Sequence, residues 1–100
     1  MSVREFRESP WEQGADEERN YVLDTTPWGG SPSSPVVKLF EGDDEDVSAT
    51  KLSGAASVNG NSITTPMVVG LDAGQEYRLE IQFTVEGRVE EAYGHIICAR

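Results

Sequence analysis

The sequence has little cysteine and no long apolar run. Cys98 is the one cysteine in 100 residues, so an internal disulfide cannot form and the usual covalent support of a small secreted domain is missing. The first ten residues, MSVREFRESP, hold no apolar stretch of signal-peptide length, and no run approaches the length of a membrane span. These absences predict a soluble, cytoplasmic protein.

Positive charge is also scarce. Only 8 Lys and Arg residues stand against 18 Asp and Glu residues, which gives a formal net charge of -10. The acidic residues gather within residues 1–18, within residues 41–46 and along the later part of the chain. Nucleic acids and anionic membranes would repel such a surface, so we expect neither as a partner.

The parts of a catalytic site are missing. His95 is the one histidine, no serine lies in a G-x-S-x-G elbow, and the glycines of TPWGGSPSSP are not followed by a helix or a lysine. Glu90 and Glu91 alternate along a predicted strand and resemble ordinary surface residues. We therefore expect a protein that is not an enzyme and has no cofactor.

Metal binding is not expected either. His95 and Cys98 lie three residues apart on a predicted strand, so they point to opposite faces and do not chelate one ion. The acidic turn of residues 43–46 (DDED) fails the EF-hand pattern, because Ala49 and Ala55 occupy the positions of its glycine and its last glutamate. A solvated turn is the preferred interpretation, and a weak calcium site there is the alternative.

What is present divides the chain into two parts. Residues 1–19 are polar and acidic without periodicity, which predicts a flexible amino-terminal tail. Residues 20–100 alternate short apolar stretches with turn signals, which predicts one all-β domain of about seven strands. The expected strands cover residues 20–25, 35–41, 47–52, a hairpin around Asn59-Gly60 with Pro66 in its second arm, 76–85 and 88–99.

The most regular segment is GLDAGQEYRLEIQFTVEGR, residues 70–88. From Tyr77 onward, alternate residues are apolar, which predicts a strand with one buried face. A buried tyrosine at the start of such a strand needs a partner for its hydroxyl, and the loop before it offers backbone groups. Gly74 allows that loop to turn tightly, and Leu71 would close the end of the core.

The segment LDAGQEY resembles the tyrosine corner of fibronectin type III and related immunoglobulin-like domains. The resemblance implies an immunoglobulin-like antiparallel β-sandwich over residues 20–100. It departs from antibody domains, because a Cys-Trp-Cys framework is missing and Trp28 follows the first strand.

The order of the segments NYVLDTTPW, PVVKLF, VNGNSITT and GLDAGQEYRLEIQFTVEGR also resembles small single-domain phage proteins similar to fibre–tail adaptors. That resemblance implies a structural role in an assembly, and a virion location if the chain is phage-derived.

Four residues are candidates for a partner surface. Tyr93, His95 and Ile97 would share the outer face of the last strand if Ala92, Gly94, Ile96 and Cys98 face the core, and the reverse facing is the alternative.

Trp28 is the fourth candidate, as the anchor of a binding loop, although capping of the core is its preferred interpretation. We expect a non-enzymatic protein-interaction or structural adaptor module. The alternative is a carbohydrate- or surface-ligand-binding module, which would need Trp11, Trp28 and Tyr93 as exposed aromatic residues.

Overall fold

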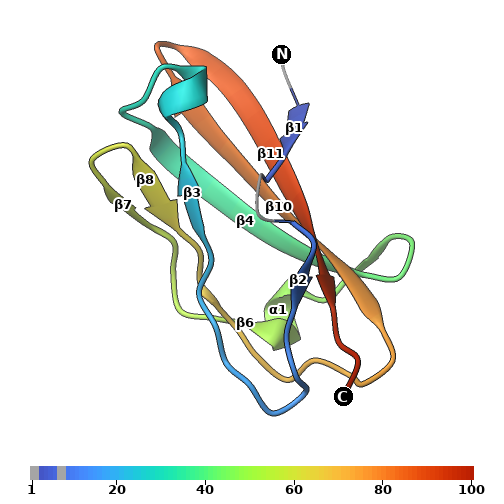
Figure 1. Cartoon of the computed structure of the whole chain (residues 1–100). Coiled ribbons are helices and arrows are strands. Elements are labelled where there is room, and N and C mark those ends of the chain that lie inside the picture. Colours follow the sequence, from blue (N-terminus) through green and yellow to red (C-terminus); the bar gives the residue numbers. More distant parts are fainter. Residues whose placement is uncertain (1–2, 7–8) are drawn as a thin grey trace.

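The structure is a computed structural model that describes residues 3–6 and 9–100. This part of the chain contains eleven strand segments, a single turn of 3-10 helix and a four-residue α-helix (Figure 1). The long strands are β4 (Ser33–Glu41), β10 (Glu76–Val85) and β11 (Arg88–Ile97). The short elements are β1 (Val3–Glu5), β2 (Trp11–Glu12), β3 (Val22–Asp24), η1 (Thr26–Trp28), β5 (Glu45–Asp46), α1 (Ser48–Lys51), β6 (Leu52–Ser53), β7 (Ser57–Asn59), β8 (Ser62–Thr64) and β9 (Met67–Val68).

The three long strands form the centre of the larger sheet. Its strand order is β1-β11-β10-β4-β5, and β2 also pairs with β11. The hairpin of β10 and β11 is in register from Glu76 opposite Ile97 to Val85 opposite Arg88. Glu86 and Gly87 form its turn with φ angles of 51° and 77°, the conformation that matches the twist of the two strands.

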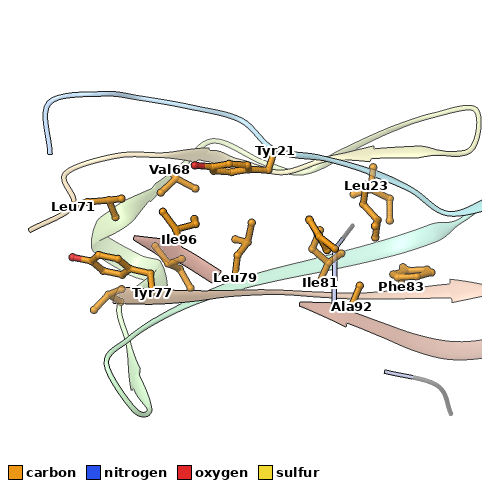
Figure 2. Packing of buried hydrophobic residues seen from close by; sticks show 14 of the residues in the cluster. Tyr21, Leu23, Val68, Leu71, Tyr77, Leu79, Ile81, Phe83, Ala92 and Ile96 are labelled. Carbon is orange, nitrogen blue, oxygen red and sulfur yellow. The ribbon is translucent and has the colours of Figure 1, made fainter. Parts of the chain in front are cut away.

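A second layer packs over this sheet. It consists of the three-stranded sheet β3-β8-β7 and the two-stranded sheet β6-β9. Figure 2 shows Tyr21, Leu23 and Val68 of this layer pointing toward side chains of β10 and β11. The all-β class is therefore confirmed, with two layers around one core, an arrangement compatible with a β-sandwich.

The alternation predicted for β10 holds along its whole length. The buried side of the strand carries Tyr77, Leu79, Ile81, Phe83 and Val85, and each of them is at most 1% exposed. A strand with this pattern must lay its apolar side on another layer, and it thereby fixes which face of the larger sheet is the inner one.

The predicted hairpin around Asn59-Gly60 is present as β7 and β8. Asn59 is the last residue of β7 and lies opposite Ser62, so the two turn residues are Gly60 and Asn61. Pro66 lies between β8 and β9, where the chain leaves one sheet and enters another. A proline is tolerated at this position because it does not have to donate in the middle of a ladder.

The prediction of a strand over residues 47–52 is wrong. Ser48–Lys51 forms α1, and β6 begins only at Leu52. The Asp46 carboxylate accepts a hydrogen bond from the backbone N–H of Ser48 at 2.9 Å, and this local bond turns the chain into the helix. The backbone nitrogen of Lys51 then donates to the carbonyl of Val47 at 2.9 Å.

The amino-terminal segment also differs from the flexible tail that the sequence predicted. β1 and β2 both run parallel to β11 and pair with it, as Figure 1 shows in blue. Phe6 is 3% exposed and belongs to the core. Residues 1–2 and 7–8 of the expected tail lie outside the described residues.

Trp11 explains why this segment packs on the sheet. Its ring lies 4.9 Å from the ring of Phe6 and 4.4 Å from that of Tyr21, measured between centroids. It also covers Gly94, where an added methyl carbon would come within 2.5 Å of Cζ3 of Trp11. A glycine on the inner side of β11 thus leaves the space that the indole fills.

In the described residues, no helix is long and apolar enough to cross a membrane.

Candidate interaction surface

β11 faces as predicted, with its small and aliphatic residues pointing inward. Ala92, Gly94, Ile96 and Cys98 are buried, whereas Tyr93, His95 and Ile97 lie on the outer side of the sheet. His95 is exposed, and the other two outer side chains are half-buried. The rings of Tyr93 and His95 meet edge to face with centroids 5.7 Å apart. Three of the four candidate residues therefore share one face.

The register of the larger sheet brings further side chains beside them. Tyr93 lies opposite Glu80, and Glu80 lies opposite Lys38 of β4. Directly paired residues of antiparallel strands point to the same side, so these three form one row across the outer face.

A hollow of about 290 Å³ opens between β4, β10 and β11 on this outer face. Its lining includes Val36, Lys38, Glu80, Glu91 and Tyr93. Val36 is 48% exposed and lies on the part of β4 that pairs with β10 but not with β5. The hollow therefore combines an aliphatic and an aromatic wall with charges of both signs.

Arg78 is held at the edge of this hollow. Its guanidinium bonds the Glu80 carboxylate at 2.6 Å and the Asp44 carboxylate at 3.2 Å, and it stacks on Phe40 with 4.7 Å to the ring centroid. The hydrogen bond to Glu80 raises the pKa of Arg78 above its already high ordinary value. By contrast, Lys38 forms no ion pair within residues 3–6 and 9–100, and its ammonium is available to a partner.

Two carboxylates of the acidic turn accept hydrogen bonds from groups of the same chain. Asp44 bonds Arg78, and Asp46 bonds Ser48. Hydrogen bonds from the hydroxyl and the backbone N–H of Ser48 lower the pKa of Asp46 below its ordinary value. Within the described residues, no cluster of three or more His, Cys, Asp or Glu side chains is arranged to hold a metal ion.

Trp28, the fourth candidate, does not lie on this surface. It is 8% exposed and packs edge to face on Phe83 in the core, with ring centroids 5.3 Å apart. Its carbonyl accepts a hydrogen bond from Arg88 at 3.2 Å. The one-turn helix η1 carries the indole inward at the end of the sandwich, where it closes the core.

The corner residues occupy the opposite end of the core, where Figure 2 shows Leu71 and Tyr77. Tyr77 is 1% exposed, and its hydroxyl accepts a hydrogen bond from the backbone N–H of Asp72 at 2.8 Å. The same hydroxyl donates to the Glu41 carboxylate at 2.8 Å. Gly74 has a φ of 88°, a left-handed conformation that favours glycine.

Desolvation by burial raises the pKa of the Tyr77 phenol well above its ordinary value. The expected hydrogen bond between the Tyr77 hydroxyl and the backbone of the preceding loop is present, and a second bond to the Glu41 carboxylate adds to it.

Sequence reasoning missed one buried charge. Glu90, interpreted as a surface residue, is 5% exposed and lies opposite Phe83 on the inner side of the hairpin. Its carboxylate lies 3.5 Å from the Arg88 guanidinium. The signal was available, because Glu90 shares the even-numbered side of β11 with Ala92 and the other inward residues.

Searches with this chain found no matching family model, no matching curated protein and no matching solved structure.

Proposed function

We propose that the chain is an immunoglobulin-like sandwich that serves as a non-enzymatic protein-interaction or structural adaptor module. The arrangement that supports the fold is the pairing of β3 with β8 in one layer and of β4, β10 and β11 in the other. This order parallels the B–E and C–F–G pairings of immunoglobulin-like domains. Tyr77 lies at the start of β10, as the corner tyrosine lies near the start of strand F in that family.

The observation that carries the interaction role is the hollow beside Tyr93. An exposed valine, a half-buried tyrosine and a lysine without an ion pair in the described residues line one concavity on an outer sheet face. Partner proteins use such sites, because a tyrosine buried at the centre of an interface contributes strongly to affinity. A role in a larger assembly, such as a tail or another virion component, rests on the resemblance of the segment order alone.

The carbohydrate-binding alternative gains no specific support. Sugar rings stack on several coplanar aromatic side chains, but Trp28 is in the core and Trp11 is packed between Phe6 and Tyr21. Tyr93 alone remains beside the hollow. A single tyrosine gives less stacking surface than such a module requires.

A photo-crosslinking amino acid at position 93 tests the interaction role in extracts of the source cells. The matched control carries the same group in place of Val58, which is 41% exposed in the other layer. We expect a discrete protein adduct from position 93, competed by excess unlabelled chain, and none from position 58. The captured partner, once purified, should bind the Tyr93→Ala variant at least ~10-fold more weakly than the parent.

An unchanged Kd for Tyr93→Ala would contradict the proposal, as would adducts of equal yield from the two positions. The two chains that carry the photo-crosslinking group, at position 93 or at position 58, should unfold at the same midpoint as the parent. Neither Tyr93 nor Val58 lies in the core.

A further inference from the structure

Asn59 and Gly60 lie at the tip of the β7–β8 hairpin, on the layer opposite to the hollow. Asn59 is exposed, and its side chain makes no hydrogen bond in the part of the chain that the structure describes. The backbone nitrogen of Gly60 is likewise without an acceptor there. The side-chain amide of Asn59 and the backbone nitrogen of Gly60 are thus both free of hydrogen bonds in this part of the chain.

We propose that Asn59 is a site of spontaneous deamidation through a succinimide. The Gly60 nitrogen loses its proton to water and attacks the side-chain carbonyl carbon of Asn59. A new C–N bond closes a five-membered ring, the side-chain nitrogen takes up a proton from water, and its bond to carbon breaks, so that ammonia leaves. Water then opens the ring at one of its two carbonyls, which yields aspartate or isoaspartate at position 59.

The glycine and the edge position of β7 make this ring closure accessible. Gly60 has no side chain to block the approach, and apart from its two chain neighbours no described residue comes within 4 Å of the place where a Cβ would stand. All three residues of β7 are exposed, and the strand pairs only with β8 in the described residues. An element with few buried contacts opens locally at low cost, which permits the backbone rotation that the attack needs.

Asn61 provides an internal comparison two residues away. Its side-chain oxygen accepts from the Ser31 backbone N–H at 2.9 Å, and its side-chain nitrogen lies 3.5 Å from the Thr26 hydroxyl. Its carbonyl accepts from both the nitrogen and the hydroxyl of Thr25, at 2.8 and 2.7 Å. These bonds hold the Asn61 amide and backbone away from a cyclic geometry, so this residue should react slowly in the folded protein.

Asn20 is restrained in another way. Its side-chain nitrogen donates to the carbonyl of Thr65 at 2.8 Å. The nitrogen that would attack belongs to Tyr21, which is buried and donates to the Thr65 hydroxyl at 2.9 Å. Of the three asparagines, only Asn59 has both reacting groups free.

The reaction would alter the hairpin. Each product adds one negative charge to a chain of net charge -10. Isoaspartate also lengthens the backbone by one methylene, which is incompatible with the two-residue turn that sets Asn59 opposite Ser62.

The test is incubation of the purified full chain in mildly alkaline buffer, followed by trypsin digestion and fragment-ion mass spectrometry of residues 52–78. Net loss of ammonia and gain of water makes the product about 1 Da heavier. Incubation in ¹⁸O-labelled water adds about 2 Da more and marks the ring-opening step. We expect the label at position 59 to accumulate at least ~10-fold faster than at position 61, a barrier difference of ~1.4 kcal/mol.

Two controls separate the chemistry from the folded restraint. The Asn59→Gln variant keeps a side-chain amide but would close a larger ring, so its peptide should stay unlabelled. In concentrated urea the bonds that hold Asn61 are lost, so the rate ratio between positions 59 and 61 should fall. An unlabelled position 59 in the parent would overturn the proposal, as would equal rates at the two positions in the folded chain.

Discussion

At the scale of single residues, the Tyr77 hydroxyl joins two elements at the end of the core. It accepts from the Asp72 backbone in the loop before β10 and donates to Glu41 at the end of β4. A hydroxyl is the one neutral group that does both from the end of an aromatic ring. The ring meanwhile supplies apolar volume that a smaller polar side chain would not.

Replacement of Tyr77 by phenylalanine should therefore destabilise the fold. The Tyr77→Phe variant keeps the ring but leaves the Asp72 N–H and the Glu41 carboxylate without this partner. We expect a loss of about 1–3 kcal/mol in the free energy of unfolding. Urea denaturation measures it, and Tyr93→Phe on the outer face is the matched control with an expected change within about 0.5 kcal/mol. Coincident unfolding curves for Tyr77→Phe and the parent would contradict the role of the corner.

The bond of the Tyr77 hydroxyl to the preceding loop could be predicted from the sequence, and its bond to Glu41 could not. A tyrosine six residues after Leu71 points back to the loop that precedes it, so a bond within residues 70–74 follows from spacing. Glu41 is 36 residues away, and only the pairing of β4 with β10 brings it to the hydroxyl. Glutamate on a strand has many possible partners, and its sequence position does not select one.

At the scale of elements, the correct predictions concern strands whose signal lies within their own sequence, and the wrong ones concern short elements without such a signal. β10 carries its signal within itself, because its residues alternate strictly between the core and solvent. α1 is only four residues long and has no room to display a helical period, so residues 47–52 were predicted as a strand. β1 and β2 are equally short, and each pairs with a strand more than 80 residues later in the chain.

The contact between Trp11 and Gly94 tests the placement of the amino-terminal segment. A methyl group in the Gly94→Ala variant would lie 2.5 Å from Cζ3 of Trp11, so the indole must move away. We expect a loss of about 1–3 kcal/mol in the free energy of unfolding, as for other overpacked sites, together with a change in tryptophan fluorescence.

The Trp11→Ala background is the control for this contact. Without the indole, the added methyl group meets little, so Gly94→Ala should cost clearly less there than in the parent chain. The difference between the two costs is the coupling energy of the pair, and residues in contact usually couple by about 0.5–3 kcal/mol. Additive costs would show that Trp11 does not lie on Gly94 in solution.

At the scale of the whole molecule, the candidate surface depends on which strands become neighbours. Alternate residues of a strand share one face, so the sequence alone grouped Tyr93, His95 and Ile97 on the outer side of β11, given that the small residues of that strand face the core. The hollow required β4 to lie beside β10, a pairing that skips β5 to β9 in the chain order. Trp28 lies in a loop rich in proline and glycine, which has no period that tells inside from outside, so its burial was favoured only because a large aromatic side chain is usually at least partly buried.

The two layers are also joined by a buried polar side chain that no sequence pattern indicated. Gln13 is 1% exposed, and its nitrogen donates to the carbonyls of Glu17 and Val68 at 2.9 and 2.8 Å. Its oxygen accepts from the Tyr21 hydroxyl at 2.7 Å, and burial raises the pKa of that tyrosine. Glutamine is usually exposed, so its burial here follows from the supply of partners on three separate segments.

Loss of this side chain should cost more than loss of an exposed one. Gln13→Ala leaves the Tyr21 hydroxyl buried without its partner, at about 1–3 kcal/mol while that group stays unsatisfied, whereas the Val68 carbonyl keeps the backbone N–H of Arg19. Gln82→Ala is the matched control, because Gln82 is exposed and its side chain donates to Glu91 at 3.3 Å, and we expect a change within about 0.5 kcal/mol. Urea denaturation compares the two variants.

The Tyr21→Phe variant then separates the bond from the packing. It removes the hydroxyl that Gln13 accepts from, so Gln13→Ala should cost less in that background than alone. Unfolding midpoints that agree between the Gln13→Ala and Gln82→Ala variants would mean that residues 9–19 do not close the sandwich in solution. Because Tyr93 and the hollow lie on the other face of the larger sheet, partner binding should survive Gln13→Ala wherever the domain stays folded.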